Sequence, residues 1–224
     1  MLLQCETDRD ELAAEACSWL HADTLESLAE LNELSLTLLA EQAAARGAAA
    51  GVLLRLVAES WRALDAAARR RAASCPYLLV DAGFADPLRW RAPPTPQVGD
   101  VAHPAYTAFF TVPAAAMVAR LVFTYAWHLA RTQGAAARLL LGMPPPSVAL
   151  IRHYTLCQIQ ALAESHLEWL RPRWPARVQV WRELLQAAAA GEPAPLERAR
   201  LRGLTLLAAE ARATPRPERP AQLP

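Results

Sequence analysis

Gly134-Ala135-Ala136-Ala137-Arg138-Leu139-Leu140-Leu141 repeats, 87 residues later, the stretch Gly47-Ala48-Ala49-Ala50-Gly51-Val52-Leu53-Leu54. Further identities follow at an interval of 91 residues, where Ala72, Ser74, Leu79, Ala85, Trp90 and Arg91 return as Ala163, Ser165, Leu170, Ala176, Trp181 and Arg182. The interval grows by four residues, and Pro144-Pro145-Pro146 is a suitable place for an insertion. Repeats of this length predict two related units that pack as a pseudo-dimer within one chain. The alternative is chance similarity in a chain rich in Ala, Leu and Arg.

Length and composition favour a folded, helix-rich protein. The chain has 224 residues, 54% of them hydrophobic, and a mean hydropathy of +0.08. A chain of this size can bury one large core or two smaller ones. All 23 basic residues are arginine, and Asn32 is the single asparagine, which is typical of a GC-rich bacterial coding sequence rather than of a particular function.

Charge is distributed unevenly along the chain although its net value is only +1. Residues 1–65 carry 12 acids and 4 arginines, whereas residues 66–224 carry 10 acids and 19 arginines. This asymmetry predicts either an electrostatic contact within the protein or an anionic partner for its second part.

The four cysteines form no CxxC pair, and the first residues are too acidic and too short in apolar run to predict a signal peptide. The most apolar region, 105–130, is interrupted by Pro113 and Arg120 and is too short for a transmembrane helix. We therefore expect a cytoplasmic protein with reduced thiols and no membrane contact.

Hydrophobic periodicity predicts helices over most of the chain, and the expected fold class is all-α. The expected helices cover about 9–20, 24–46, 52–64 and 66–74, and then 113–133, 134–141, 147–154, 156–167, a segment ending near 190, and 196–212. Asp65 and Thr155 are expected helix caps. Residues 77–84 are the only stretch that looks extended, as one short strand or a buried loop.

These elements suggest five segments. The first helical unit covers 1–91, a Pro-rich linker covers 92–104, and the second, basic unit covers 105–190. A C-terminal helix at 191–212 and a disordered tail at 213–224 complete the chain.

The second unit resembles a known family over residues 121–174. A helix with Tyr125-Ala126-Trp127-His128-Leu129-Ala130 leads to Leu141-Gly142-Met143, then to Thr155–Ser165, and then to Arg171-Pro172-Arg173-Trp174. This order is similar to that of FlhD, the flagellar transcriptional activator subunit, and the first unit is similar more loosely, through Glu30–Leu36 and Leu39–Gln42. Pro172 departs from the family pattern, since it stands where the family has an aromatic residue.

The resemblance implies a function. Proteins of the FlhD family are intertwined helical dimers that act with FlhC, which makes much of the promoter contact. We therefore expect a transcription regulator, an activator in bacterial flagellum biogenesis, whose partner is an FlhC-like protein or a second copy of the chain, with DNA binding as a secondary property. The alternative is a helical scaffold or accessory protein of a secretion or envelope system that binds protein only.

The candidate binding residues lie in the second unit, which carries 8 arginines and 2 acids between positions 120 and 182. Guanidinium groups can hold phosphate through paired hydrogen bonds, and aromatic neighbours can stack on bases or on the guanidinium. The candidates for contact with nucleic acid or another anionic partner are Arg152, Arg171, Arg173, Arg177 and Arg182. The candidate interface residues are Tyr125, Trp127, Leu141, Trp169 and Trp174. The alternative is a solvated basic face over a Trp-anchored core.

No catalytic motif is present in the sequence. It holds no G-x-S-x-G, P-loop or G-x-G-x-x-G pattern, and its histidines and cysteines do not have the spacing of a metal site. We therefore expect a protein that is not an enzyme and that uses no cofactor, metal or small-molecule substrate.

Overall fold

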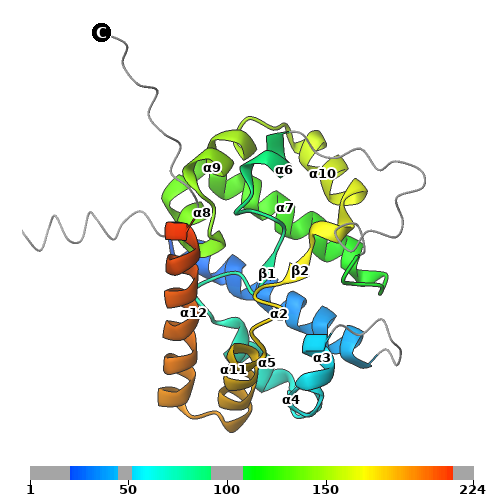
Figure 1. Cartoon of the computed structure of the whole chain (residues 1–224), viewed down its shortest axis with the longest axis vertical. Helices are drawn as coiled ribbons and strands as arrows, with labels where there is room; N and C mark the ends of the chain where they lie inside the picture. The colour runs from blue at the N-terminus through cyan, green and yellow to red at the C-terminus, as the bar shows by residue number, and fades with distance from the viewer. Residues whose placement is uncertain (1–20, 45–51, 92–107, 214–224) are drawn as a thin grey trace, which may run out of the picture.

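The computed structural model describes residues 21–44, 52–91 and 108–213, and this part of the chain is mostly helical (Figure 1). The predicted all-α class is confirmed. The expected helix at 9–20, the whole linker at 92–104 and the tail residues 214–224 lie outside the described residues.

The first unit contains five described helices and one short strand. They are α2 (Ala22–Ala44), α3 (Val52–Leu56), α4 (Ala58–Arg62), α5 (Ala66–Ala73), β1 (Val80–Asp81) and α6 (Pro87–Arg91). Asp65 caps α5 as expected, because its Oδ1 accepts a hydrogen bond of 2.7 Å from the amide of Ala68. The single helix expected over 52–64 is wrong, since the chain breaks at Val57, whose side chain is buried.

The second unit repeats this order. Its elements are α7 (Ala114–Thr132), α8 (Gly134–Leu141), α9 (Pro145–Ile151), α10 (Leu156–Ser165), the 3₁₀ turn η2 (Leu167–Trp169), β2 (Arg171–Pro172) and α11 (Val178–Ala190), and α12 (Pro193–Ala213) follows. Thr155 and Gln158 form a capping box at the start of α10. Helix α9 begins at Pro145, 87 residues after α4 begins at Ala58. The four residues by which the interval grows therefore lie after the start of α9, not at the three prolines. Strand β2 was not expected from the sequence.

The two strands pair with each other in a reciprocal register. Val80 lies opposite Pro172 and Asp81 lies opposite Arg171 in an antiparallel pair. Positions 80 and 81 correspond to 171 and 172 at the 91-residue interval, so each residue pairs with the counterpart of its neighbour. An isologous contact across a two-fold axis produces this pattern.

Two Thr–Gln contacts join α2 to the segment that contains α7. The side chains of Thr24 and Gln133 are hydrogen-bonded at 3.0 Å, and Gln42 Nε2 donates to Thr111 Oγ1 at 3.1 Å. Thr24 and Thr111 correspond at the 87-residue interval, whereas the counterpart of Gln42 at that interval is Leu129 and not Gln133. Because each bond joins one end of α2 to the opposite end of the α7 segment, the two helices run antiparallel.

Two tryptophans at equivalent positions each pack against the other unit, with different partners. Trp90 of α6 packs against Phe123 and Trp169 of the second unit, with ring centroids 5.5 and 5.4 Å apart. Trp181 of α11 packs against Trp61 of the first unit at 6.0 Å. At the level of elements, α6 contacts α9 while its counterpart α11 contacts α4. The pseudo-dimer itself stays a prediction.

Asn32 ties α2 to the segment that leads into β1. This fully buried side chain donates from Nδ2 to the carbonyl oxygens of Ala73 (3.0 Å) and Tyr77 (2.9 Å), and its Oδ1 accepts from the amide of Leu79 at 2.8 Å. The amide therefore satisfies backbone groups that would otherwise be buried without partners.

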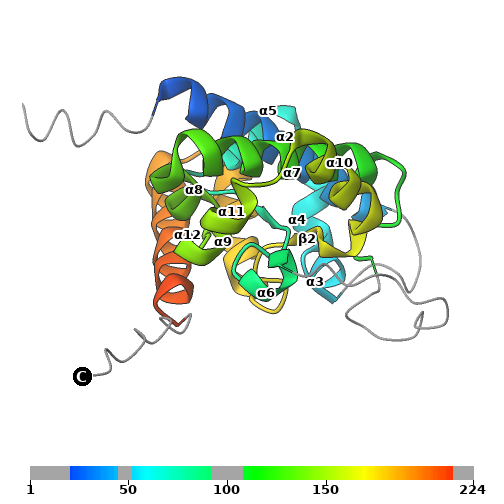
Figure 2. The same cartoon turned by 90° about the horizontal axis from the view of Figure 1, so that it is seen from above.

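The C-terminal helix α12 has no counterpart among the described residues of the first unit. It lies along α11 at one side of the molecule (Figures 1 and 2). Leu196, Ala199, Gly203 and Leu207 form its buried seam. Gly203 is required there because a Cβ at this position would lie 2.0 Å from the hydroxyl oxygen of Tyr77.

Candidate functional site

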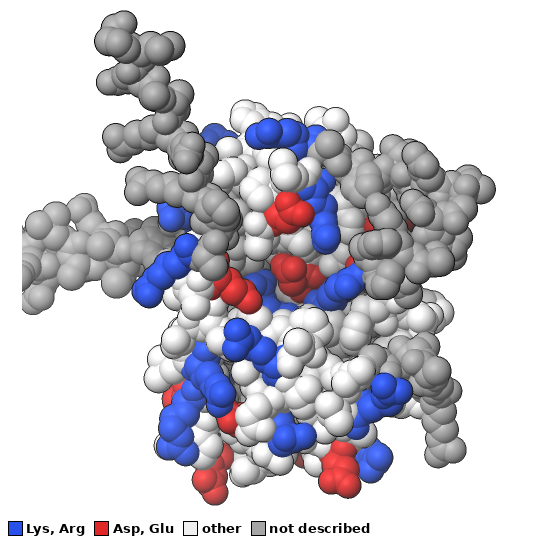
Figure 3. Space-filling view, viewed as in Figure 1, with Lys and Arg blue, Asp and Glu red and all other residues white. Residues whose placement is uncertain are grey.

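The predicted arginines do not form one cluster. Arg152 is exposed directly after α9, whereas Arg177 and Arg182 lie at the start of α11. Helix α9 lies in the upper half of Figure 1 and α11 in its lower half. Arg171 is half-buried in β2, and its Nε donates to the carbonyl oxygen of Glu168 at 3.1 Å. Figure 3 shows basic side chains scattered over one face and interleaved with acidic ones.

Arg173 is not a surface residue, which corrects its assignment as a contact for an anionic partner. Its side chain is buried, and its Nε and Nη2 donate to the carbonyl oxygens of Leu78 (2.8 Å) and Leu141 (2.9 Å). Its own amide donates to Leu79 at 2.9 Å. The guanidinium thus joins β2 to the segment before β1 and to the end of α8, and it has no access to a ligand.

The predicted interface residues contact other residues of the same chain, either between the two units or within one of them. The Tyr125 hydroxyl donates to the carbonyl oxygen of Thr24 at 2.7 Å, which joins α7 to α2. Trp169 and Leu141 are buried in the core, and the Trp127 indole donates to Tyr154 at 2.7 Å. Trp174 Nε1 donates to Glu210 of α12 at 2.7 Å. Leu141, Trp169 and Trp174 are buried by these contacts, whereas Tyr125 and Trp127 are half-buried.

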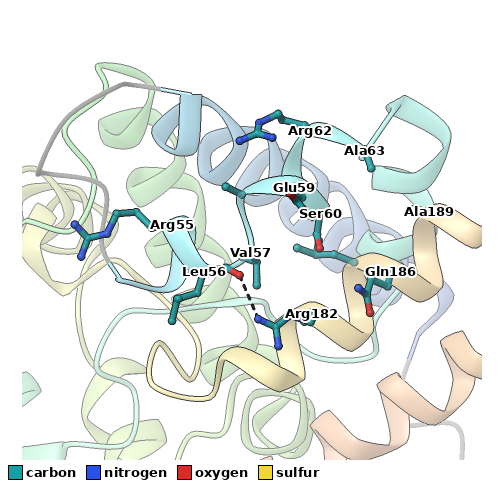
Figure 4. Close-up of a pocket in the computed structure, with 12 residues that line it drawn as sticks. Arg55, Leu56, Val57, Glu59, Ser60, Arg62, Ala63, Arg182, Gln186 and Ala189 are labelled. Carbon is teal, nitrogen blue, oxygen red and sulfur yellow. Dashed lines mark hydrogen bonds between the residues drawn. The ribbon is translucent and has the colours of Figure 1, made fainter.

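A groove of about 630 Å³ lies between the α3–α4 segment and α11 (Figure 4). Its charged lining consists of Arg55, Arg62 and Arg182 with one acid, Glu59. Arg182 approaches from α11 and donates through Nη2 to the carbonyl oxygen of Leu56 at 3.3 Å and through Nη1 to Gln179 at 3.1 Å. The groove is therefore basic, and we call it the α4–α11 groove.

A second groove lies on the other side of α11, against α12, and its charges are largely paired. Arg202 donates to Glu183, and both oxygens of that carboxylate accept, at 2.7 and 2.5 Å. A hydrogen bond from Gln179, with a further contribution from Arg202, lowers the pKa of Glu183. Arg198 also lines this second groove, which thus holds two arginines and one acid and has less attraction for an anion than the α4–α11 groove with its three arginines and one acid.

Sequence reasoning identified Arg182 but missed Arg55 and Arg62. The two missed residues flank a break between two short helices, and both are exposed. Their spacing carries no signal by itself, since only the packing of α4 against α11 places them around Arg182.

The groove offers guanidinium groups and no recognisable catalytic arrangement. Among the described residues, no group of three His, Cys, Asp or Glu side chains could hold a metal ion. In that same part of the chain, no helix combines the length and apolar character needed to cross a bilayer. The chemistry available at the groove is the binding of an anion through charge-assisted hydrogen bonds.

Comparison with known proteins identifies no relative: no family model, curated protein or solved structure matches this chain.

Proposed function

We propose that the protein is a cytoplasmic bacterial transcription regulator that resembles FlhD and acts mainly through contacts with a protein partner. In this proposal its two units together replace the two subunits of a homodimer. On this proposal the protein is a binding protein rather than an enzyme. The partner that we expect for it is an FlhC-like protein.

The reciprocal register of β1 and β2 is the observation that carries this proposal. Val80 pairs with Pro172 and Asp81 with Arg171, as corresponding segments of two subunits would pair across a two-fold axis. The crossed contacts of Trp90 and Trp181 support the same arrangement. Since the FlhD family is built on an intertwined dimer, a chain whose halves exchange equivalent contacts suits that role.

In this proposal DNA contact is secondary and uses the α4–α11 groove. Arg55 and Arg62 are exposed, and Arg182 is only half-buried, so their guanidinium groups are accessible to phosphate. Three arginines and one acid provide a modest positive potential. Affinity for DNA by the protein alone should therefore be weak and should fall steeply as salt is added.

The decisive experiment for the regulator is co-purification of the full chain with the FlhC-like protein of the same organism. We expect a complex that is stable in size-exclusion chromatography and that binds a flagellar promoter fragment more tightly than either protein alone. Absence of a complex, together with absence of a gel shift at low salt, would remove the proposal.

The groove can be tested separately by fluorescence anisotropy with a labelled duplex at 50 and 200 mM salt. The variant R55A/R62A/R182A should weaken binding and flatten its salt dependence, because each lost phosphate contact reduces the slope by about one. The matched control, R91A/R138A/R212A, removes three exposed arginines elsewhere and should retain the affinity. Equal losses in the two variants would reject the groove as a specific contact.

The second candidate is a scaffold that binds protein only. It is favoured because several of the predicted arginines are buried or hydrogen-bonded within the chain. Arg173 is buried, and Arg171 and Arg182 each donate to a backbone carbonyl. A scaffold of this kind would co-purify with a partner from a secretion or envelope system. It would show no salt-sensitive affinity for DNA, even at 50 mM salt.

A further inference from the structure

Two neighbouring helices of the structure carry opposite charge on their outer faces. α2 contains Asp23, Glu26, Glu30, Glu33 and Glu41 and no arginine, whereas α7 contains Arg120 and Arg131 and no acid. All of these charged residues are exposed except Glu33, which is half-buried. The two helices contact each other and lie on the same side of the molecule (Figure 2).

Large apolar side chains are exposed between these charges. Leu34 of α2 is 37% exposed, and Met117 and Leu121 of α7 are 51% and 41% exposed. Leu34 and Leu121 correspond at the 87-residue interval. The surface formed by the exposed residues of the two helices is called the α2–α7 face below.

The positive charges of this face are only weakly neutralised within the chain. Arg120 Nε lies 3.9 Å from Glu164 Oε1, but both side chains are more than half exposed, so the pair contributes little. The Arg131 guanidinium lies over the Trp127 ring, 4.9 Å from its centroid, which holds the charge in place without compensating it.

The register between the two helices follows from the Thr–Gln contacts. Thr24 lies level with Gln133 at one end, and Gln42 lies level with Thr111 at the other. Leu34 is therefore level with Leu121 near the middle of the face.

We propose that the α2–α7 face is a self-association surface on which α2 of one copy lies on α7 of a second copy. A two-fold axis that runs between the helices and parallel to them brings the faces together in this way. Leu34 of each copy then lies opposite Leu121 of the other. The acidic first turns of α2 oppose Arg131, and Glu33 opposes Arg120.

Charge selects this arrangement over the alternative. A two-fold axis perpendicular to the helices would place α2 on α2, with five acids facing five acids, and would place α7 on α7. Like charges in direct opposition disfavour that mode.

The size of the face is sufficient for a specific dimer. A helix of 23 residues is about 35 Å long, and two adjacent helices cover a width of about 20 Å. The resulting face of about 700 Å² per copy is close to the roughly 800 Å² per partner of a standard interface. This proposal is independent of DNA binding and of an FlhC-like partner.

Sedimentation equilibrium of the full chain tests the proposal. We expect a dimer at 50 mM NaCl whose dissociation constant rises at least tenfold at 500 mM NaCl, because the charges of the face are exposed to screening. A chain that stays monomeric at low salt and at high protein concentration would overturn it.

Charge reversal tests the predicted pairing of α2 with α7. The variants E26R/E30R and R120E/R131E should each be monomeric, while an equimolar mixture of the two should form a heterodimer, since each reversed helix then meets its complement. The control E59R/E192R reverses two exposed acids away from the face and should dimerise like the original chain. Circular dichroism of each variant confirms that it is folded.

Failure of the mixture to associate, with both variants folded, would exclude the pairing of α2 with α7. If instead both reversal variants remain dimeric, the chain associates through another surface and the proposal is wrong. If the reversals abolish only the capture of a protein partner, the face belongs to that partner and not to a second copy.

Discussion

Gly83 and Trp174 stand 91 residues apart at equivalent positions of the two units, and both adopt the left-handed backbone conformation, with φ of 72° and 51°. Each lies two residues after a strand ends and four residues before the next helix begins. Glycine adopts this conformation without steric cost, whereas tryptophan does not. The second unit therefore forms the same turn at a cost that the contacts of Trp174 with Tyr77 and Glu210 must offset.

Gly83→Ala should destabilise the protein by about 1 to 3 kcal/mol. Alanine at this position would have to adopt the left-handed backbone conformation, and its Cβ would lie 2.8 Å from Cδ of Arg89. Urea unfolding followed by circular dichroism measures the change. Gly134→Ala is the control, because it begins a helix and its Cβ would meet only Val148 at an ordinary 3.5 Å. An equal loss in both variants would contradict the explanation.

Asn32→Ala should lower the free energy of unfolding by roughly 2 to 4 kcal/mol. The substitution leaves the carbonyl oxygens of Ala73 and Tyr77 and the amide of Leu79 buried without their partner. Thr37→Ala is a suitable comparison, since the Thr37 hydroxyl bonds only to the carbonyl of Glu33 within its own helix. That change should stay within about 0.5 kcal/mol. A small effect at Asn32 would mean that water replaces its amide.

Arg173→Leu should cost roughly 2 to 4 kcal/mol, because Leu78 and Leu141 lose the donor for their buried carbonyl oxygens. Arg173→Lys should also destabilise, since one ammonium group cannot reproduce the geometry of the guanidinium. Arg177→Ala removes an exposed arginine four residues later and should be nearly neutral. Thermal and urea unfolding compare the three variants. Full stability of Arg173→Lys would show that charge rather than shape matters at this position.

Stability should fall in alkaline solution, and Cys75 is one cause. Burial raises the pKa of its thiol from 9.0 to about 11, so between these values the unfolded chain releases this proton while the folded protein retains it. The unfolded state then binds fewer protons, and the free energy of unfolding decreases as pH rises, by at most about 1.4 kcal/mol per pH unit for this group. Burial also raises the pKa of Tyr77 and Tyr125, which adds to the loss above about pH 10.

Urea unfolding at pH 8, 9 and 10 measures this dependence. Cys75→Ser should reduce the slope between pH 9 and 10, whereas Cys157→Ser should leave it unchanged because Cys157 is exposed. Identical slopes in the original chain and in Cys75→Ser would exclude a contribution from this thiol.

Local sequence was sufficient to predict most helices and their caps. Gly134–Leu141 forms the helix that its periodicity predicts, and Thr155 caps α10 through a hydrogen bond to Gln158, three residues away. These features depend on neighbours within one or two helical turns, so a short window of sequence contains the information. The repeat added a long-range expectation, because similar segments favour similar structures.

Tertiary packing decided the roles of individual polar residues. Nothing near Arg173 in the sequence distinguishes it from Arg177, yet the first is buried against backbone carbonyls 95 and 32 residues away and the second is exposed. Strand β2 has no signal of its own because two residues form a strand only when a partner such as β1 is present. The α4–α11 groove likewise exists only once α4 and α11 meet.

The sequence by itself determined where the helices form and that the chain contains two similar parts, since hydrophobic periodicity, caps and repeats are local or directly comparable properties. The tertiary structure alone decided which arginines reach solvent and which residues join the two units. Burial and hydrogen bonding of a side chain depend on segments far away in the chain, and those segments become neighbours only in the folded protein.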